Sequence, residues 1–293
     1  MQLRHARYFI ATAEAGTVSG AAAAVHVTQP ALSRQLRQLE ADLGVDLFER
    51  RAGRLVLSRT GRALLPAARA VLAAVEEMRA TASFLAHDHL QRVSIAAPTV
   101  TLTDVVQPFV ATMSPDDPII DVRAADGFSA TELLDGGADL VIGLRPAPAP
   151  YLARPLAELP VRAFVPRGDP WASRERVALE ELVARPLIVP PPTFASRQAL
   201  DAAVANSGVS PGSVLEVANG TIAQAMAAAG RGVGVVSDDP RFELVALPIA
   251  VNEALLRIRL HVGWDARRPA AGDLESLASR LVDFVHRRYG TAE

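Results

Sequence analysis

The sequence predicts a mixed α/β protein in three consecutive parts: a small helical head, one long helix and a larger α/β body. Leucines recur at steps of 4, 3 and 4 from Leu32 to Leu43, which is typical of an amphipathic helix. A second apolar series, with steps of 4 and 3, continues over residues 64–85 and predicts a much longer helix. After Arg92 short apolar runs alternate with helical patterns, which indicates an α/β sheet.

Length and charge fit this division. At 293 residues the chain can form two or three domains with cores of their own. Residues 1–62 carry nine arginines against five acidic residues, a net charge of +4, and the whole chain carries −2, so the remainder carries −6. A basic head beside an acidic body favours a nucleic-acid partner for the head alone.

The sequence marks both ends of the first amphipathic helix. Thr28 is placed to accept a hydrogen bond from an N–H of the first turn, and Pro30 lacks an N–H that would be unpaired there. Gly44 follows the last leucine and predicts the end of the helix. The Ala-rich segment from Ser19 to Val25 predicts a preceding helix that crosses closely, and residues 26–28 are short enough to be the turn between the two.

The polar side of this helix has the composition of a DNA-reading surface. Opposite the leucine stripe lie Pro30, Ser33, Arg34 and Arg37, without a large apolar residue. Short side chains let a helix approach base edges in the major groove, and guanidinium groups hold phosphates. An amphipathic helix within a larger core explains the stripe equally well when the helix is considered alone. The segment that follows favours the DNA reader.

That segment is a basic hairpin pattern over residues 48–59. Its arginines surround Gly53, the expected turn, and the alternative is a solvated arginine face. A basic hairpin beside such a helix is typical of a wing that contacts phosphates or the minor groove. The residues predicted to contact DNA are Thr28, Gln29, Pro30, Ser33, Arg34, Arg37, Arg50, Arg51 and Arg54.

The longer apolar series predicts a linker helix over residues 60–88. Thr60 is expected to cap it, and Pro66 to bend its first turn. One apolar seam with charged flanks favours pairing with a second copy over packing within the same chain, because a two-fold protein matches paired half-sites on DNA. The residues 87–89, His-Asp-His, are predicted to be a polar turn and not a metal site. The seam consists of Leu64, Ala68, Val71, Val75, Met78, Ala82 and Leu85.

Several short motifs resemble the LysR-type transcriptional regulators. The resemblance implies a winged helix-turn-helix DNA-binding domain, a dimerising linker helix and a two-lobed effector domain. Gly20 departs from the family pattern at a helical position. The motifs are Ala21–Ala23, Thr28–Ser33, Leu39-Glu40, Leu43-Gly44, Leu47–Arg50 and Leu57–Gly61 in the head, and Leu133–Leu140 in the body.

The body reads as two similar α/β blocks joined by the proline-rich residues 145–150. A late strand at residues 255–262 and a closing helix at 274–287 return to the first block. This pattern predicts a fold like the periplasmic binding proteins, with crossovers near Val161 and near Gly263-Trp264. The predicted domains are 1–59 for DNA binding, 60–88 for the linker and 89–293 for effector binding, with lobe I at 89–161 and 265–293 and lobe II at 162–264.

Ligands of open α/β sheets sit beyond the carboxyl ends of strands, near helix N-termini. That rule, with the family resemblance at Thr99, Ser129 and the Pro190–Phe194 loop, predicts a site for a small anion or polar metabolite. Phe128 is expected to shape the pocket. Each hydroxyl or amide has the alternative role of an ordinary helix cap. The candidate effector residues are Thr99, Thr101, Phe128, Ser129, Arg145, Pro190, Thr193, Phe194, Arg197, Asn219 and Gly220.

Enzyme chemistry is not predicted. The chain has no cysteine, which excludes thiolate chemistry and disulfides. Gly230–Gly234 superficially resembles a dinucleotide loop, but it precedes a predicted strand instead of following one. We therefore expect neither catalytic residues, nor a metal, nor a cofactor.

The sequence as a whole predicts a cytoplasmic transcription regulator, since it shows neither a secretory signal nor a membrane span. The expected partners are double-stranded promoter DNA, a small-molecule effector, further copies of the chain as a dimer paired into a tetramer, and RNA polymerase. Two alternatives are weighed against this. A solute-binding protein with an accessory helical domain requires an export signal, and an oxidoreductase requires a bound cofactor.

Overall fold

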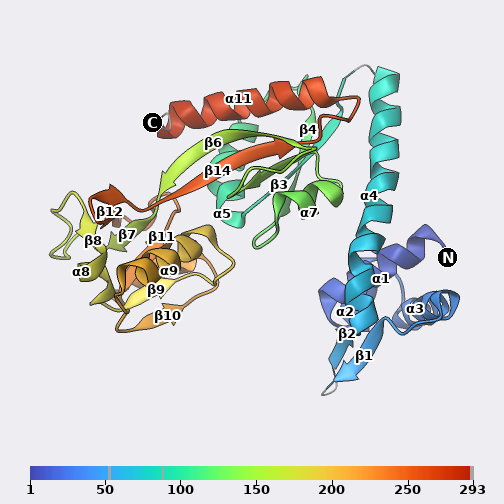
Figure 1. Ribbon diagram of the computed structural model, residues 1–293, viewed down its shortest axis with the longest axis horizontal. Helices are drawn as coiled ribbons and strands as arrows, with labels where there is room; N and C mark the ends of the chain where they lie inside the picture. The colour runs from blue at the N-terminus through green and yellow to red at the C-terminus, as the bar shows by residue number, and fades with distance from the viewer. Residues whose placement is uncertain (52–53, 88, 291–293) are drawn as a thin grey trace. The chain divides into compact units, whose positions relative to one another are not determined.

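The computed structural model describes residues 1–51, 54–87 and 89–290 (Figure 1). The chain divides into two compact units. The first comprises residues 1–88 and 135–137, and the second comprises residues 89–134 and 138–293. Each unit has a hydrophobic core of its own.

The first unit begins with a three-helix head and a hairpin. Its elements are α1 (Leu3–Ala15), α2 (Val18–Ala24), α3 (Gln29–Leu43), β1 (Phe48–Arg51), β2 (Arg54–Leu57) and α4 (Arg59–His87). Leu32, Leu36 and Leu39 of α3 are buried with Phe9 of α1 and the alanines of α2. β1 and β2 pair antiparallel, which confirms the predicted hairpin, and its expected turn at Gly53 lies outside the described residues.

α4 runs without interruption from Arg59 to His87, but its start differs from the prediction. The Ser58 hydroxyl caps it by accepting a hydrogen bond from the Gly61 N–H at 2.8 Å, so the predicted cap at Thr60 is wrong. Thr60 is already part of the first turn, because the helix begins one residue earlier. Pro66 was expected in the first turn, but it lies inside the helix, which continues past it.

The apolar seam of α4 divides into two parts. Leu64 and Ala68 pack against the core of the head. Val71, Met78 and Leu85, further along the same seam, are 38%, 67% and 74% exposed. A row of large apolar side chains with that exposure is typical of a surface that pairs with another helix.

The second unit is built on two sheets. The five-stranded sheet contains β3 (Arg92–Ala97), β4 (Ile119–Ala124), β5 (Leu140–Gly143), β6 (Leu152–Pro160) and β14 (Arg257–Trp264) in the order β4-β3-β5-β14-β6. The larger sheet contains β7 (Arg162–Val165), β8 (Val177–Ala178), β9 (Leu187–Val189), β10 (Val214–Glu216), β11 (Val233–Val236), β12 (Val245–Val251) and β13 (Ala254–Leu255) in the order β10-β9-β11-β7-β12-β13, and β8 also pairs with β12.

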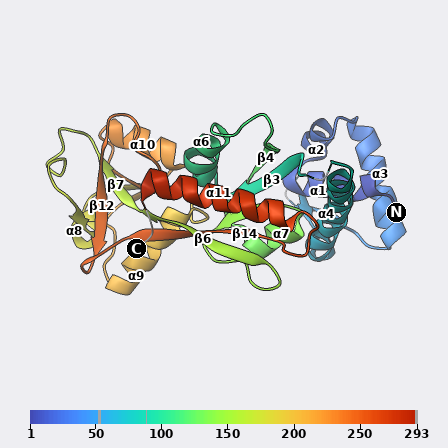
Figure 2. The same cartoon turned by 90° about the horizontal axis from the view of Figure 1, so that it is seen from above.

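Helices pack on both sheets and define two lobes. Lobe I is the five-stranded sheet with α5 (Thr99–Thr101), the π-helical turn η1 (Leu102–Val106), α6 (Gln107–Val110), α7 (Ala130–Asp135) and α11 (Ala271–Tyr289). Lobe II is the larger sheet with α8 (Leu179–Val183), α9 (Ala195–Ser207) and α10 (Gly220–Ala228). Figures 1 and 2 show α11 lying along β6 and β14.

The chain crosses between the lobes twice. The first crossing follows β6 at Val161, near the predicted place. The second lies at Leu256, where β13 ends and β14 begins, so the prediction of Gly263-Trp264 is wrong. Those two residues already pair with β6 in lobe I, opposite Ala153 and Leu152. The prediction failed because the strand β6 was not recognised in the sequence.

Among the described residues, no helix combines the length and the apolar character that a membrane span requires.

Candidate functional sites

The polar face of α3 is presented to solvent as predicted. Gln29, Pro30, Arg34 and Arg37 are exposed and Ser33 is half-buried. On the opposite face Leu32, Leu36 and Leu39 are at most 6% exposed, whereas Leu43 is 41% exposed and lies outside the core. Gly44 ends the helix with φ 68°, a conformation that favours glycine.

Thr28 precedes α3 but does not cap it with its side chain. Its backbone has the extended geometry of a capping residue, yet within the described residues its hydroxyl makes no capping hydrogen bond. A capping side chain bonds the N–H of the second or third helical residue, and Pro30 occupies the second position without an N–H. The predicted cap is therefore wrong, and Thr28 is exposed beside the polar face.

α2 is fixed closely against α3. The Thr17 hydroxyl accepts a hydrogen bond from the Gly20 N–H at 3.1 Å and caps α2. A Cβ at Gly20 would lie 2.9 Å from that hydroxyl oxygen, so glycine at this position accommodates the cap. Ala21 and Ala22 are 0% and 3% exposed, as expected where two helices cross closely. Across the turn the Ser19 hydroxyl donates to Gln29 Oε1 at 3.0 Å.

The hairpin is attached to α3 by a carboxylate. Glu40 Oε1 accepts hydrogen bonds from the backbone N–H groups of Leu47 at 2.8 Å and Phe48 at 3.3 Å. The Phe48 ring also packs edge-on against Phe9, with ring centroids 5.6 Å apart. These contacts fix the first strand of the hairpin beside α3. The side chains of the predicted wing residues Arg50, Arg51 and Arg54 lie outside what the structure describes.

In the second unit, the predicted anion site at Thr99 is already engaged by a carboxylate. Asp126, in the loop after β4, accepts hydrogen bonds from the Thr99 N–H at 3.1 Å and from its hydroxyl. The groups that were expected to hold an anionic ligand therefore bind a side chain of the chain itself. A ligand at this place meets the acceptor oxygens of Asp126, which favour a hydrogen-bond donor.

The loop that carries Asp126 approaches lobe II. A Cβ at Gly127 would lie 3.3 Å from the methyl carbon of Thr193, so these two predicted ligand loops meet between the lobes. Phe128, the next residue along the chain, is 47% exposed, so it lies outside the hydrophobic core. Of the predicted residues, Thr99 and Thr193 are thus brought to the same loop, residues 126–128, which also carries Phe128.

Other predicted ligand residues have structural roles. Ser129 bonds Glu132 at 2.7 Å in a capping arrangement at α7, and Asn219 caps α10 by accepting from the Ile222 N–H at 3.0 Å. Arg197 donates to Asp201 at 2.8 Å and to the Pro190 carbonyl at 3.3 Å. Phe194 stands at the N-terminus of α9, Gly220 is buried beside Asp238, and Arg145 is exposed.

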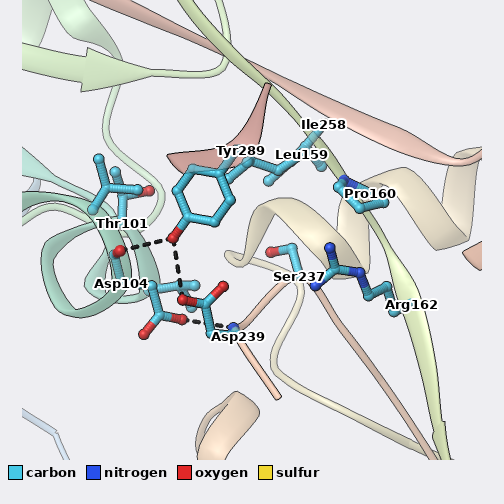
Figure 3. Close-up of a pocket in the computed structure, with 11 residues that line it drawn as sticks. Thr101, Asp104, Leu159, Pro160, Arg162, Ser237, Asp239, Ile258 and Tyr289 are labelled. Carbon is cyan, nitrogen blue, oxygen red and sulfur yellow. Dashed lines mark hydrogen bonds between the residues drawn. The ribbon is translucent and has the colours of Figure 1, made fainter. Parts of the chain in front are cut away.

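A small pocket lies where the strands cross between the lobes (Figure 3). Of the residues predicted to bind an effector, Thr101 lines this pocket, and its other lining residues have no local signal in the sequence. Apolar walls come from the crossover strands, and polar groups come from both lobes. Its lining includes Thr101, Asp104, Leu159, Pro160, Arg162, Ser237, Asp239, Ile258 and Tyr289.

One side of this pocket is a network of hydrogen bonds between the lobes. Asp104 of η1 pairs with Arg241 at 2.5 Å and accepts from the Asp239 N–H at 2.9 Å. The Tyr289 hydroxyl lies 2.8 Å from the Asp104 carbonyl oxygen and 3.2 Å from Asp239 Oδ2, as Figure 3 shows. Arg288 also pairs with Asp239, at 2.8 Å. Charged groups of lobe I and lobe II therefore neutralise each other here.

Asp238, next to Asp239 of this network, has a raised pKa. It is 4% exposed, and its Oδ2 has no hydrogen-bond partner among the described residues. Burial, followed by the negative charge of Asp104, raises the pKa of Asp238 to about 6. Arg241 opposes the shift, but its nearest nitrogen is 3.9 Å away.

The part of the chain that the structure describes contains no group of three or more His, Asp or Glu side chains that could hold a metal ion.

Each of the two units matches a known protein-family model. Residues 3–62 match the family described as "Bacterial regulatory helix-turn-helix protein, lysR family", and residues 87–289 match the "LysR substrate binding domain". The chain belongs to the LysR family. This membership confirms the family predicted from the sequence. It also confirms the predicted function, a transcription regulator with a DNA-binding and an effector-binding domain, since the family consists of regulators and not of enzymes.

Curated relatives support the same assignment. The LysR regulator is 33% identical to the HTH-type transcriptional regulator TfdT of Cupriavidus pinatubonensis, over 67% of this chain and 90% of that protein. It is 30% identical to an HTH-type transcriptional regulator of Mycobacterium bovis over 94% of both chains.

Solved structures confirm the fold. The structure of CbnR, a LysR family transcriptional regulator, covers 100% of both chains with a TM-score of 0.65 and 22% identity. Full-length OxyR of Pseudomonas aeruginosa covers 98% of this chain and 95% of that one, with a TM-score of 0.59 and 21% identity. The predicted winged helix-turn-helix, linker helix and two-lobed domain of the LysR regulator are therefore the architecture of its family.

The raised pKa of Asp238 predicts a specific pH dependence of stability. The folded LysR regulator retains this proton up to about pH 6, whereas the unfolded chain releases it near its ordinary pKa of about 3.8. Between these values the folded state binds more protons, so its free energy of unfolding falls as the pH rises, by about 3 kcal/mol in total. In Asp238→Asn this contribution is absent, so the variant should gain stability relative to the unmodified protein between pH 4 and 7.

The measurement is urea unfolding across this pH range, followed by fluorescence of Trp171 and Trp264, which both lie in the second unit. Asp116→Asn, at an exposed position, is the control and should follow the unmodified protein. An identical pH profile for Asp238→Asn would contradict the assignment.

Proposed function

We propose that α3 of the LysR regulator is its DNA-reading helix and that the hairpin β1–β2 is a wing beside it. In this proposal Gln29, Pro30 and Ser33 contact the bases and determine which DNA sequence is recognised, with Thr28 beside them. Arg34 and Arg37 hold phosphates, together with Arg50, Arg51 and Arg54 of the wing. The observation that carries the proposal is the exposed face of α3, polar and cationic, on a helix whose other face is locked into the core of the head.

We propose further that α4 joins two copies through its exposed seam and that dimers pair into tetramers. Met78 and Leu85 are too exposed to stabilise a single chain, and the seam repeats at the spacing of a coiled coil. A two-fold assembly presents two reading helices to paired half-sites, which raises the affinity for DNA through multivalency.

The proposed effector is a small polar molecule held between the lobes near Thr99, Asp126, Phe128 and Thr193. These residues converge from loops of both lobes, so a ligand there can bias the lobes toward one arrangement. Of the two ligand classes predicted from the sequence, a small anion or a polar metabolite, a polar metabolite with hydrogen-bond donors fits better, because Asp126 already bonds the donors of Thr99 that would suit an anion. No separate cofactor is part of the proposal.

We place the protein in the cytoplasm, where promoter DNA lies, and expect it to contact RNA polymerase. Membership of a transcription-regulator family supports both statements, since such a protein acts on the recruitment or activity of the polymerase.

Two substitutions on α3 should separate sequence choice from general affinity. Ser33→Ala removes a hydroxyl near the bases and should relax preference at one base step, with little change on random duplex. Arg34→Ala removes a phosphate contact and should weaken binding to every sequence, reducing the slope of log affinity against log salt by about one unit. Fluorescence anisotropy on the gene's own upstream DNA and on random duplex measures both. Equal losses on the two duplexes for Ser33→Ala would contradict its role.

Charged substitutions on the seam should separate the copies. Met78→Glu with Leu85→Glu places acidic groups where two apolar seams would meet, so sedimentation equilibrium should show a smaller assembly, and operator affinity should fall by at least about tenfold. Arg79→Glu, which lies on the flank of α4 beside Glu76, is the matched control and should keep the assembly. An unchanged assembly in the double variant would refute pairing through α4.

The effector site predicts a ligand response that depends on Phe128. A thermal-shift screen of the full chain against small carboxylates, amines and neutral aromatics should find a compound that raises the midpoint, because a ligand of the folded state stabilises it in proportion to its occupancy. Phe128→Ala should weaken that compound about tenfold. Phe242→Ala removes a similarly exposed phenylalanine of lobe II, 52% against 47% exposed, and should leave the response unchanged. Equal effects of the two variants would exclude the proposed site.

A further inference from the structure

The turn between α2 and α3 is bridged by one side-chain hydrogen bond. Ser19, the second residue of α2, donates from its hydroxyl to Oε1 of Gln29, the first residue of α3, at 3.0 Å. Both side chains are exposed on the side of the head that carries the polar face of α3. The bond therefore acts on a residue proposed to face the bases, while Ser19 belongs to the other helix.

The position of Ser19 is set by contacts that do not involve DNA. The Thr17 cap fixes the first turn of α2, and Gly20 leaves room for that cap. Directly after it, Ala21 and Ala22 are buried against α3. Ser19 thus stands on a rigid turn at a close helix crossing, and its hydroxyl is held ready for Gln29 before any DNA is bound.

The bond sets the orientation of the Gln29 amide. A glutamine amide carries a carbonyl oxygen that accepts hydrogen bonds and an NH2 group that donates them, pointing to opposite sides within one plane. With Oε1 turned toward Ser19, the NH2 group is turned away from Ser19 and is the half presented to a partner in the groove. In the major groove guanine presents two neighbouring acceptors, N7 and O6, and thymine presents O4. Adenine places its N6 donor beside its N7 acceptor, so the usual glutamine–adenine pair uses both halves of the amide at once, and an amide that presents only NH2 gains one bond there instead of two.

We propose that Ser19 is a positioning residue for base selection: it orients the Gln29 amide with NH2 outward, so that the LysR regulator selects guanine or thymine over adenine at the base that Gln29 contacts. This inference rests on the proposed role of α3 as the reading helix. It goes further by naming the chemical edge that is read and a residue of α2 that sets it.

The experiment compares base preferences of the full-length protein and its variants. Binding sites are selected from a randomised duplex library at low ionic strength, and affinities for the best site and all its single-base variants are measured by anisotropy. Gln29→Ala identifies the step that Gln29 contacts, as the one at which discrimination is lost. At that step the unmodified protein should prefer guanine or thymine over adenine by about fivefold or more.

Ser19→Ala should reduce this preference by about threefold to tenfold at that step alone, because the amide can then turn and accept from adenine. Ser19→Thr keeps a hydroxyl and should restore the profile, which a purely structural role of the serine would not require. Circular dichroism melting of each variant confirms that the head remains folded.

Each contrary result has a distinct meaning. A preference for adenine at the Gln29 step, or an unchanged profile in Ser19→Ala, overturns the role of Ser19 and leaves α3 as the reading helix. Equal weakening on all duplexes by Ser19→Ala, with a smaller salt slope, shows instead that Ser19 contacts phosphate and also overturns it. Failure of the unmodified protein to select any site overturns the reading-helix proposal together with this inference.

Discussion

The burial of one side of α3 is the constraint on which the head depends. Leu32, Leu36 and Leu39 are almost fully buried, and each such side chain contributes about 1.5–3 kcal/mol when it leaves water. They fix the rotation of the helix about its axis. Since the helix cannot turn, the residues on its other side face solvent as a group, and Glu40 then holds the hairpin beside them. Core packing and the presentation of the polar face are consequences of the same three side chains.

Elements with local signals could be predicted from the sequence, and elements defined by distant partners could not. α3, the hairpin and α4 follow from periodicity, from Gly44 and from the arginine-rich turn. β6 was missed because Pro155 and Pro160 and its charged residues obscure a strand pattern. It is an edge strand, where proline is tolerated, and its pairing partner β14 lies about a hundred residues later in the chain. Without β6 the second crossover was placed too late.

The site residues show the same limit in finer detail. Hydroxyls at predicted helix starts suggested caps at Thr28 and Thr60, but Pro30 removes one donor from the first helix, and in the second Ser58 directly precedes the helix whereas Thr60 lies inside it. At Thr99 the sequence indicated donors suited to an anion, and only the fold shows that Asp126 already engages them. Asp104 and Arg241 are 137 residues apart, so their pairing has no counterpart in any local motif.

The two lobes are joined unevenly, and this bears on how an effector can act. On one side the Asp104–Arg241 pair and the bonds of Tyr289 and Asp239 connect the lobes, and removing one partner of such a buried pair costs about 3–5 kcal/mol. On the other side Gly127 and Thr193 approach each other by van der Waals contact, which individually contributes a few tenths of a kcal/mol or less. Of these two contacts between the lobes, the one between Gly127 and Thr193 is therefore the less costly to change. A ligand at the proposed site would need little binding energy to change the Gly127–Thr193 contact, whereas moving the lobes apart at the Asp104–Arg241 pair would require that ion pair to break.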